Sequence, residues 1–408
     1  MQSWLSGGQA VVKMRRYKYD VLVVGAGPGG SMAARFAARH GLRVLVVEKR
    51  PEIGVPVRCA EGISRTWLDE VEIEPQKRWI DAEIDGAKIY SPNERYVLKL
   101  SADQAGNEVG FVLNREYFDK ELASLAVKEG AELWVKSPAV NIIKEDGFVK
   151  GAIVRRFGEE VEVRARIVIA ADGFESQVAR WAGLNTVLRE RDVDSCIQYR
   201  MTNIDIEENF THFYIGSCAP GGYIWIFPKG KNEANVGIGV ALNKIKDRGE
   251  VKKYLDAFIE KHPNLRKGTP IQIVTGAVST CPVPKHIVDN GIMLVGDAAR
   301  LIDPITGGGI ANACISGKYA GEIAAKCIEN PSKECLEEYQ NRVKQRWERK
   351  HLRNWFVKEK LAALDDDTLN KLMEVISQEE IKKLSVRGIL EAVQKRYPEL
   401  IEEFEDLL

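Results

Sequence analysis

The sequence predicts a mixed α/β fold with a parallel βαβ unit near the N-terminus, an antiparallel sheet in the middle of the chain and helices at the C-terminal end. Three observations support this prediction. An apolar run, a glycine-rich turn, a helix-like segment and a second apolar run follow one another within residues 20–48. Short strand-like runs fill residues 194–240, whereas residues 332–408 show helical periodicity. Strands with one buried face alternate with period two, and helices bury every third or fourth residue.

The N-terminal unit has the order of elements that a dinucleotide site requires. Its turn reads Gly25-Ala26-Gly27-Pro28-Gly29-Gly30, and its second strand ends at Glu48. Gly25 permits the tight turn, Gly27 lets the backbone approach a pyrophosphate, and Gly30 lets helix and strand pack closely. The free N–H groups at the start of the helix favour phosphate charge, and Glu48 is suited to bind an adenosine ribose. We therefore predict a Rossmann-like dinucleotide site.

Composition and length exclude several classes of protein. The chain has 408 residues, and its Lys plus Arg and Asp plus Glu residues number 59 each, so no electrostatic argument favours nucleic acid. No apolar run is long enough to span a membrane, and the N-terminus lacks the hydrophobic region of a signal peptide. We expect a cytoplasmic protein of two or three domains. Residues 1–17 show no periodicity, and the translation start stays open between Met1 and Met14.

The seven cysteines are scattered and show no spacing typical of a metal site, so we predict no metal. An odd, scattered set fits a reducing, intracellular setting. Cys327 and Cys335 could meet across a helix–turn–helix, but we expect unpaired buried thiols at these positions.

A constrained loop follows Glu48 and contains two prolines, two glycines and the run Arg58-Cys59-Ala60-Glu61-Gly62. It should lie near the carboxyl end of the parallel sheet, where α/β folds bind ligands. A neighbouring cation such as Arg58 can lower the pKa of a thiol, which makes Cys59 a candidate reactive group. A small space-filling side chain is the alternative interpretation of Cys59.

A hairpin (87–90 with 96–100) and a helix (115–129) are the next elements that the pattern predicts, with Asn114 as the helix N-cap. Arg115 is unfavourably placed for the helix dipole, which leaves two interpretations: it binds an anion such as phosphate, or it is solvated. We expect further strands at 132–135, 139–144, 149–155 and 161–169, then Asp172-Gly173 and a helix at 177–182.

An aromatic run marks the antiparallel region, whose strands we expect at 196–201, 212–215, 223–227, 234–240 and 270–278, with a helix at 250–261. Tyr223, Trp225 and Phe227 alternate, so a strand would place all three side chains on one face. That face is either part of the core or one wall of an apolar substrate cavity.

A second glycine-to-helix junction follows near residue 300. A buried strand ends at Gly296-Asp297, and Gly307-Gly308-Gly309 precedes a helix expected at 310–328. The start of that helix offers N–H groups to a polar ligand, and Asp297 is suited to bind a ribityl hydroxyl. In the C-terminal helices, Trp347 and Trp355 lie two turns apart, which favours packing over a membrane-facing surface.

The glycine-rich unit with Glu48, the Asp172-Gly173 pair and Gly296-Asp297 together resemble the glutathione-reductase-like FAD superfamily, in the branch of the aromatic hydroxylases. The run at 58–62 and the pattern Pro-x-x-Tyr-x-Trp-x-Phe-Pro at 220–228 are similar to those of the geranylgeranyl reductases, and of the archaeal digeranylgeranylglycerophospholipid reductases in particular. The resemblance covers residues 18–330 in order. It implies an FAD enzyme that saturates isoprenoid double bonds of membrane lipids.

The resemblance also implies a site and a domain division. By position, FAD contacts carry over to Gly29, Glu48, Cys59, Ala60, Gly62, Arg115, Ala139, Asp297, Gly309 and Ile310. The cofactor motifs add Gly25, Gly27, Gly30, Arg58, Asp172, Gly296 and Gly308. We expect residues 18–82, 105–185 and 286–330 to form the FAD-binding domain, 83–104 and 186–285 the substrate domain, and 331–408 a helical region.

The chemistry of an isolated alkene sets the remaining requirements. Because no group withdraws electrons from the double bond, a proton must reach one carbon while a hydride reaches the more substituted one. A dry, aromatic-walled cavity stabilises the developing positive charge and excludes water. Tyr223, Trp225 and Phe227 are therefore the expected substrate contacts, and Cys59, Tyr223 and Trp225 the candidate catalytic residues. The acid stays open among Cys59, Tyr223 and a flavin-bound water.

Two other functions stay in view: an FAD monooxygenase or halogenase, and a non-catalytic prenyl-lipid-binding flavoprotein. The sequence contains one Gly-x-Gly-x-x-Gly turn, so we expect an external electron donor, which can be a pyridine nucleotide, a deazaflavin or a ferredoxin. Because the expected substrate is a lipid and no span exists, we also expect peripheral membrane contact.

Overall fold

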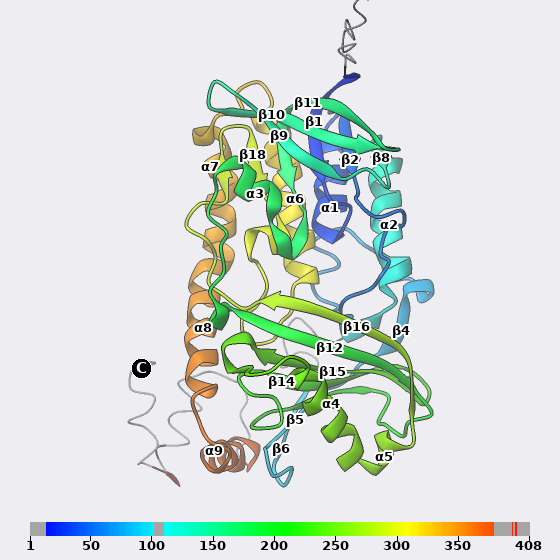
Figure 1. Cartoon of the computed structure of the whole chain (residues 1–408), viewed down its shortest axis with the longest axis vertical. Coiled ribbons are helices and arrows are strands. Elements are labelled where there is room, and N and C mark those ends of the chain that lie inside the picture. Colours follow the sequence, from blue (N-terminus) through cyan, green and yellow to red (C-terminus); the bar gives the residue numbers. More distant parts are fainter. Residues whose placement is uncertain (1–13, 102–109, 379–393, 395, 398–408) are drawn as a thin grey trace, which may run out of the picture.

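The computed structural model describes residues 14–101, 110–378, 394 and 396–397. The sheet that contains β1 lies at one end of the molecule, and the sheet that contains β12 lies at the other end (Figure 1). Helices α7, α8 and α9 extend along one side (Figure 1). The predicted mixed α/β architecture is confirmed. The division into domains stays a prediction, and its residues 102–109 and most of 379–408 lie outside the described part.

The first sheet has eight strands, and β1 pairs in parallel with both β2 and β11. Its main order is β17-β18-β11-β1-β2-β8, and β10 and β9 extend it from β11. The strands are β1 (Arg16–Val24), β2 (Val44–Val47), β8 (Glu132–Trp134), β9 (Ala139–Glu145), β10 (Phe148–Arg156), β11 (Glu159–Ala170), β17 (Val288–Asp289) and β18 (Ile292–Leu294). The last four residues of β1 and all of β2 are buried, as continuous apolar runs require in a covered parallel sheet.

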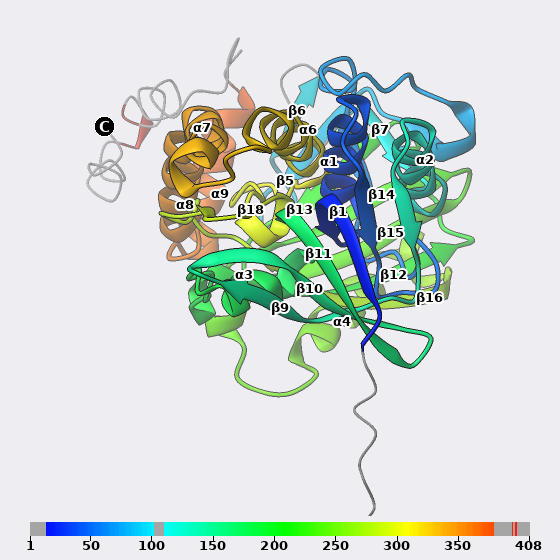
Figure 2. The same cartoon turned by 90° about the horizontal axis from the view of Figure 1, so that it is seen from above.

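Helices α1 (Pro28–Arg39) and α6 (Ile310–Cys327) pack side by side, as both views show (Figures 1 and 2). Their backbones meet closely, since a Cβ on Gly317 would lie 2.2 Å from the carbonyl oxygen of Gly29. Helix α2 (Arg115–Lys128) packs against α1, and α3 (Gln177–Ala182) follows β11. Asn114 precedes α2 as predicted, but its side chain makes no capping hydrogen bond.

The second sheet has seven strands in the order β16-β12-β15-β14-β13-β5-β6, and all neighbours are antiparallel except β13 and β5. The strands are β5 (Gly86–Tyr90), β6 (Val97–Ser101), β12 (Val193–Thr202), β13 (Phe210–Tyr214), β14 (Tyr223–Gly230), β15 (Glu233–Ala241) and β16 (Thr269–Ser279). The strands predicted from alternation are therefore confirmed, with ends that differ by a few residues. A small sheet of β3 (Gly62–Ser64), β7 (Gly110–Leu113) and β4 (Ile80–Glu83) accompanies it.

Helix α4 (Glu250–Lys261), followed by α5 (Pro263–Arg266), covers one face of the second sheet. The buried Leu255 and Phe258 of α4 pack there against side chains such as Ile197 and Ile238. The aromatic side chains of β14 belong to a separate buried cluster with Ile84. The sheet thus separates an ordinary apolar core on the α4 side from an aromatic layer.

The C-terminal helices are α7 (Lys333–Val343), α8 (Arg349–Leu361) and α9 (Asp366–Gln378), with a π-helical turn, η6 (Lys344–Glu348), between the first two. Trp347 donates a hydrogen bond to Asn312 of α6 at 3.0 Å, and Trp355 donates one to Asp192 at 3.1 Å. Packing is thus confirmed for both tryptophans. The remaining short helical turns are η1 (Lys77–Trp79), η2 (Gly173–Glu175), η3 (Glu190–Asp192), η4 (Leu242–Lys244) and η5 (Gly296–Ala299).

Cys327 and Cys335 form a disulfide, with their Cα atoms 5.9 Å apart. The prediction of unpaired thiols at these positions was wrong. Helix α6 ends at Cys327, and Cys335 lies in the first turn of α7, so the short connection places the two side chains opposite each other. This pair gives no support to the reducing setting that the scattered spacing suggests. Across the described ranges, no helix is both long and apolar enough to cross a membrane.

Candidate active site

A cavity of about 820 Å³ is lined by residues of both large sheets. The glycine-rich turn after β1, the loop around Cys59, the Gly296 and Gly308 regions and the aromatic strand β14 all contribute to it. Every residue predicted for the cofactor and substrate sites lines this cavity, with Gly30 as the exception: Gly25, Gly27, Gly29, Glu48, Arg58, Cys59, Ala60, Gly62, Arg115, Ala139, Asp172, Gly296, Asp297, Gly308, Gly309, Ile310, Tyr223, Trp225 and Phe227. Residues scattered over the sequence therefore meet at one site.

The glycines of the first turn have different structural roles. Gly25 has a φ of +105°, and a Cβ there would lie 2.3 Å from the Ala171 carbonyl oxygen, so the turn requires glycine. A Cβ on Gly30 would lie 1.9 Å from the Gly25 carbonyl oxygen, so Gly30 serves close packing below the turn. A Cβ on Gly27 would meet no described atom within 4 Å and would point into open space at the start of α1. Gly27 thus leaves a free cradle beside helical N–H groups.

Glu48 follows β2 and faces the same cavity. Its carboxylate accepts the backbone N–H groups of Ala26 and Arg50, each at 2.9 Å. These bonds fix the orientation of the carboxylate, and each oxygen keeps acceptor capacity for a further donor. A ribose hydroxyl is a donor of that kind.

The second glycine junction completes the polar part of the cavity. Asp297 lies in η5, and burial raises the pKa of its carboxyl group. Gly309 precedes α6, and a Cβ there would lie 3.0 Å from Ile302 and 3.4 Å from the Asp297 carboxylate. Asp172 accepts the Val178 N–H through Oδ2 at 2.9 Å, whereas its buried Oδ1 has no partner within the described ranges. Two helix N-termini, the cradle at Gly27 and an orphaned acceptor are features that fit a dinucleotide.

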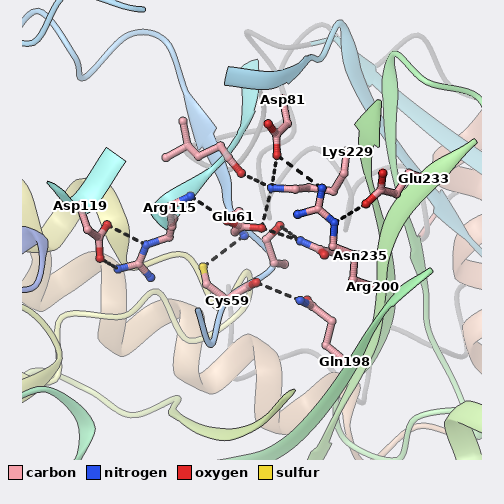
Figure 3. Close-up of polar contacts among 12 residues, drawn as sticks. Cys59, Glu61, Asp81, Arg115, Asp119, Gln198, Arg200, Lys229, Glu233 and Asn235 are labelled. Carbon is pink, nitrogen blue, oxygen red and sulfur yellow. Dashed lines mark hydrogen bonds and ion pairs between the residues drawn. The ribbon is translucent and has the colours of Figure 1, made fainter. Parts of the chain in front are cut away.

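Cys59 lies beside Arg115, the first residue of α2, and its Sγ atom accepts the Glu61 N–H at 3.2 Å (Figure 3). Burial raises the pKa of the Cys59 thiol, and this effect exceeds the lowering by Arg115. The lowering of the thiol pKa that a neighbouring cation can cause does not prevail here, so the thiol stays protonated. Arg58 is exposed, and the cation beside the thiol is Arg115.

Arg115 pairs with a carboxylate of its own helix. It forms two hydrogen bonds with Asp119, one turn along α2, at 2.7 and 3.1 Å. The side chain of Asp119 is 5% exposed and that of Arg115 is 18% exposed, so the pair is largely shielded from water. The two interpretations made from the sequence missed this partner, although its i,i+4 spacing is a signal that could have identified it.

The aromatic side chains of β14 line the cavity and pack in one buried cluster, so the interpretation as part of the core is confirmed, while their role as a wall for the substrate stays a prediction. The Tyr223 and Trp225 ring centroids are 6.0 Å apart. Phe213 of the neighbouring strand makes edge contacts with both Tyr223 and Phe227. The Tyr223 hydroxyl donates a hydrogen bond to the Thr306 carbonyl, which ties the aromatic strand to the second glycine junction.

Polar side chains that sequence analysis did not single out attach the Cys59 loop to the second sheet. Gln198 of β12 accepts a hydrogen bond from the Trp225 indole at 2.9 Å and donates one to the Cys59 carbonyl oxygen at 3.1 Å. Lys229 and Asn235 bind the next residues of the loop. A signal that could have identified these three residues is that they are polar residues inside otherwise apolar strands. In the part of the chain that the structure describes, no group of three or more His, Cys, Asp or Glu side chains could hold a metal ion.

Two family models match the chain: the FAD dependent oxidoreductase family over residues 20–219 and the geranylgeranyl reductase catalytic domain over residues 192–278. The chain is 58% identical over 393 residues to the digeranylgeranylglycerophospholipid reductase of Picrophilus torridus, which covers 96% of this chain and 99% of that protein. A solved structure of a geranylgeranyl bacteriochlorophyll reductase-like protein from Thermoplasma acidophilum is 55% identical, with a TM-score of 0.91, and covers 96% of this chain and 100% of that one.

A more distant solved structure shares the fold. The p-nitrophenol 4-monooxygenase of Pseudomonas putida superposes with a TM-score of 0.69 over 97% of this chain and 99% of that one, at 16% sequence identity. Identity this low supports a common fold and carries no argument about the reaction.

Proposed function

Because the chain belongs to the family of digeranylgeranylglycerophospholipid reductases, we propose that its cavity brings FAD and an unsaturated isoprenoid chain into contact. The protein is an FAD-dependent oxidoreductase that saturates the isolated double bonds of geranylgeranyl chains in archaeal-type ether lipids. The observation that carries the proposed site is that one cavity is lined by both the glycine-rich turn and the aromatic strand.

The polar residues of the cavity would hold the cofactor. The cradle at Gly27 and the start of α1 suit the pyrophosphate, and Glu48 suits the adenosine ribose. The start of α6 and Asp297 suit the polar atoms of the other half. When bound there, FAD supplies the hydride for the reduction.

The aromatic strand would hold the alkene. Trp225 and Phe227 are 8% and 4% exposed, so their rings present apolar surface from which water is largely excluded. Their π faces stabilise the positive charge that develops on the more substituted carbon when the other carbon is protonated. Exclusion of water also protects that carbon from attack by a nucleophile other than hydride.

Cys59 is the proton donor that the site supports best. Its thiol is neutral, as an acid must be before it reacts, and it lines the cavity. Loss of its proton to the alkene would leave a thiolate, which the Arg115 guanidinium and the Glu61 N–H would stabilise. The Tyr223 hydroxyl proton is already donated to the Thr306 carbonyl, which makes it a weaker candidate.

We also propose that the protein receives electrons from an external donor and contacts the membrane peripherally. The single Gly-x-Gly-x-x-Gly turn accounts for FAD and leaves no second such motif for a pyridine nucleotide. A pyridine nucleotide, a deazaflavin or a ferredoxin would then act from outside. The lipid chains must leave the bilayer to enter the cavity, which requires the protein to reach the membrane surface.

An anaerobic single-turnover experiment tests the function. The flavoprotein is photoreduced, a digeranylgeranylglycerophospholipid is added, and the flavin absorbance is followed while mass spectrometry counts the hydrogens gained by the lipid. We expect reoxidation coupled to the gain of two hydrogens for each flavin oxidised. A fully saturated lipid is the control and should cause no reoxidation. Failure to reoxidise with the unsaturated lipid, together with oxygen-dependent turnover of an aromatic compound, would instead identify a monooxygenase.

A further inference from the structure

Glu61 lies at the centre of a buried polar network that joins the Cys59 loop to the second sheet (Figure 3). One carboxylate oxygen accepts the backbone N–H of Arg115 at 2.9 Å, at the start of α2. The other accepts hydrogen bonds from Lys229 at 2.7 Å and from Asn235 at 2.9 Å. Asn235 also donates to the Ala60 carbonyl oxygen at 3.2 Å. A single side chain thus ties the loop to α2 on one side and to β14 and β15 on the other.

Lys229 is the buried cation of this network. Its side chain is 0% exposed, and besides Glu61 it binds Asp81 at 2.7 Å and the Leu113 carbonyl oxygen. It follows Phe227 by two residues on β14, so the strand that carries the aromatic wall also carries the cation that binds the loop. A buried ammonium group without charged or hydrogen-bonding partners would destabilise the folded protein. Lys229 therefore requires the Glu61 carboxylate beside it, and this pairing holds Glu61 in a fixed place.

The position of the Cys59 thiol depends directly on Glu61. The Glu61 backbone has a φ of +77°, an unusual conformation for a residue other than glycine. In that conformation its N–H donates to the Cys59 Sγ atom at 3.2 Å. A strained backbone persists where surrounding contacts determine it. Here they are the contacts of the Glu61 carboxylate and a backbone hydrogen bond from the Leu113 N–H to the Glu61 carbonyl oxygen at 2.9 Å.

We propose that Glu61 and Lys229 are positioning residues that fix the Cys59 thiol relative to the aromatic wall. The hydrogen bond from Lys229 to the Glu61 carboxylate fixes the loop relative to β14. The hydrogen bond from the Glu61 N–H to Sγ then fixes the sulfur within the loop. The consequence for turnover rests on the proposed function, in which Cys59 protonates the alkene. The position of the thiol itself can be measured without turnover.

Labelling of thiols by iodoacetamide in the FAD-loaded protein, mapped by mass spectrometry, tests the positioning. Glu61→Gln keeps the size of the side chain and leaves Lys229 paired with Asp81. Because the loop would open locally, we expect Cys59 to be labelled about fivefold faster or more. Cys196 lines the same cavity from β12 and should keep its rate. Equal acceleration of both thiols, or no change at Cys59, would overturn the proposal.

Glu233→Gln is the matched control, because Glu233 pairs with Arg200 at the edge of the same network and its side chain makes no described hydrogen bond to the loop. It should leave the labelling of both thiols unchanged. Labelling of Cys59 accelerated as strongly as in Glu61→Gln would show that any neutralised carboxylate loosens the region, and would contradict a specific role for Glu61.

Turnover supplies the second measurement. In photoreduced enzyme, Glu61→Gln should slow reoxidation by the lipid about tenfold or more, since a misplaced catalytic group is costly. In a Cys59→Ser background the same change should have an effect below about twofold, because residues that act through one another are not additive. Equal slowing in both backgrounds would refute positioning through Cys59. Near-normal reoxidation in Cys59→Ser alone would remove the thiol from the proposed reaction, and the labelling result would then decide the positioning separately.

Discussion

Gly237 lies directly across the β14–β15 pair from Trp225, and a Cβ on Gly237 would lie 2.3 Å from the indole ring. The Trp225 ring therefore occupies the space that any larger residue at 237 would need. Its indole N–H reaches Gln198, which in turn holds the Cys59 carbonyl. Because Gly237 has no side chain, the Trp225 ring can occupy this position.

We predict that Gly237→Ala displaces the Trp225 ring and slows reoxidation of photoreduced enzyme by the lipid about tenfold or more, with an overpacking cost of about 1–3 kcal/mol in stability. Gly239→Ala is the matched control on the same strand, because its Cβ would lie 3.4 Å from the nearest atom, the Cys196 sulfur. It should change the rate little. Equal rates in the two variants would show that the indole position is unimportant for the reaction.

Gly27→Val should abolish FAD binding, because the new side chain would fill the cradle at the start of α1. The measurement is the flavin absorbance per protein after purification and after addition of FAD. Gly276 lines the same cavity on strand β16, where the nearest atom to a Cβ is 4.0 Å away, and Gly276→Val should retain FAD. A Gly27→Val protein saturated with FAD would contradict the assignment of this turn to the cofactor.

The parts of the structure that the sequence predicts best depend on local pattern. The βαβ turn could be identified because backbone geometry requires glycine at Gly25 and Gly30, which lie within one short segment. The common face of Tyr223, Trp225 and Phe227 follows from strand alternation alone. These features involve neighbours in sequence, so no knowledge of the tertiary structure was needed.

The features that were missed depend on tertiary contacts. Lys229 and Glu61 are separated by 168 positions, and nothing in either segment indicates the other. The net rise of the Cys59 pKa could not be predicted because burial, which a sequence does not display, exceeds the effect of the nearby cation. The disulfide between Cys327 and Cys335 depends on the angle at which two helices meet.

His351 should make stability depend on pH. Its side chain is fully buried, neither ring nitrogen has a hydrogen-bond partner among the described residues, and burial lowers its pKa to about 4. Between pH 6.5 and 4 this histidine is protonated in the unfolded chain but stays neutral in the folded protein. The free energy of unfolding therefore decreases by about 3 kcal/mol as the pH falls through this window. Denaturant titrations should show a smaller loss in His351→Leu. The same loss in both proteins would contradict this assignment.

Membrane association should be reversible. This prediction rests on the proposed peripheral contact, in which the lipid chains leave the bilayer at its surface to enter the cavity. We expect high salt or mild detergent to release the protein from isolated membranes, while an integral protein of the same membranes stays in the pellet. Immunodetection in both fractions is the measurement. Release only by solubilising detergent would contradict peripheral association.

Cys59→Ser separates an acid from a space-filling residue. The variant should keep FAD and its photoreduction, because a hydroxyl can accept the Glu61 N–H and face the Arg115 guanidinium as the thiol does. If Cys59 donates the proton, reoxidation by a geranylgeranyl lipid under anaerobic conditions should slow about a hundredfold or more, which corresponds to about 3 kcal/mol of barrier. A change below about tenfold, within about 1.4 kcal/mol, would exclude the thiol as the acid and favour a bound water.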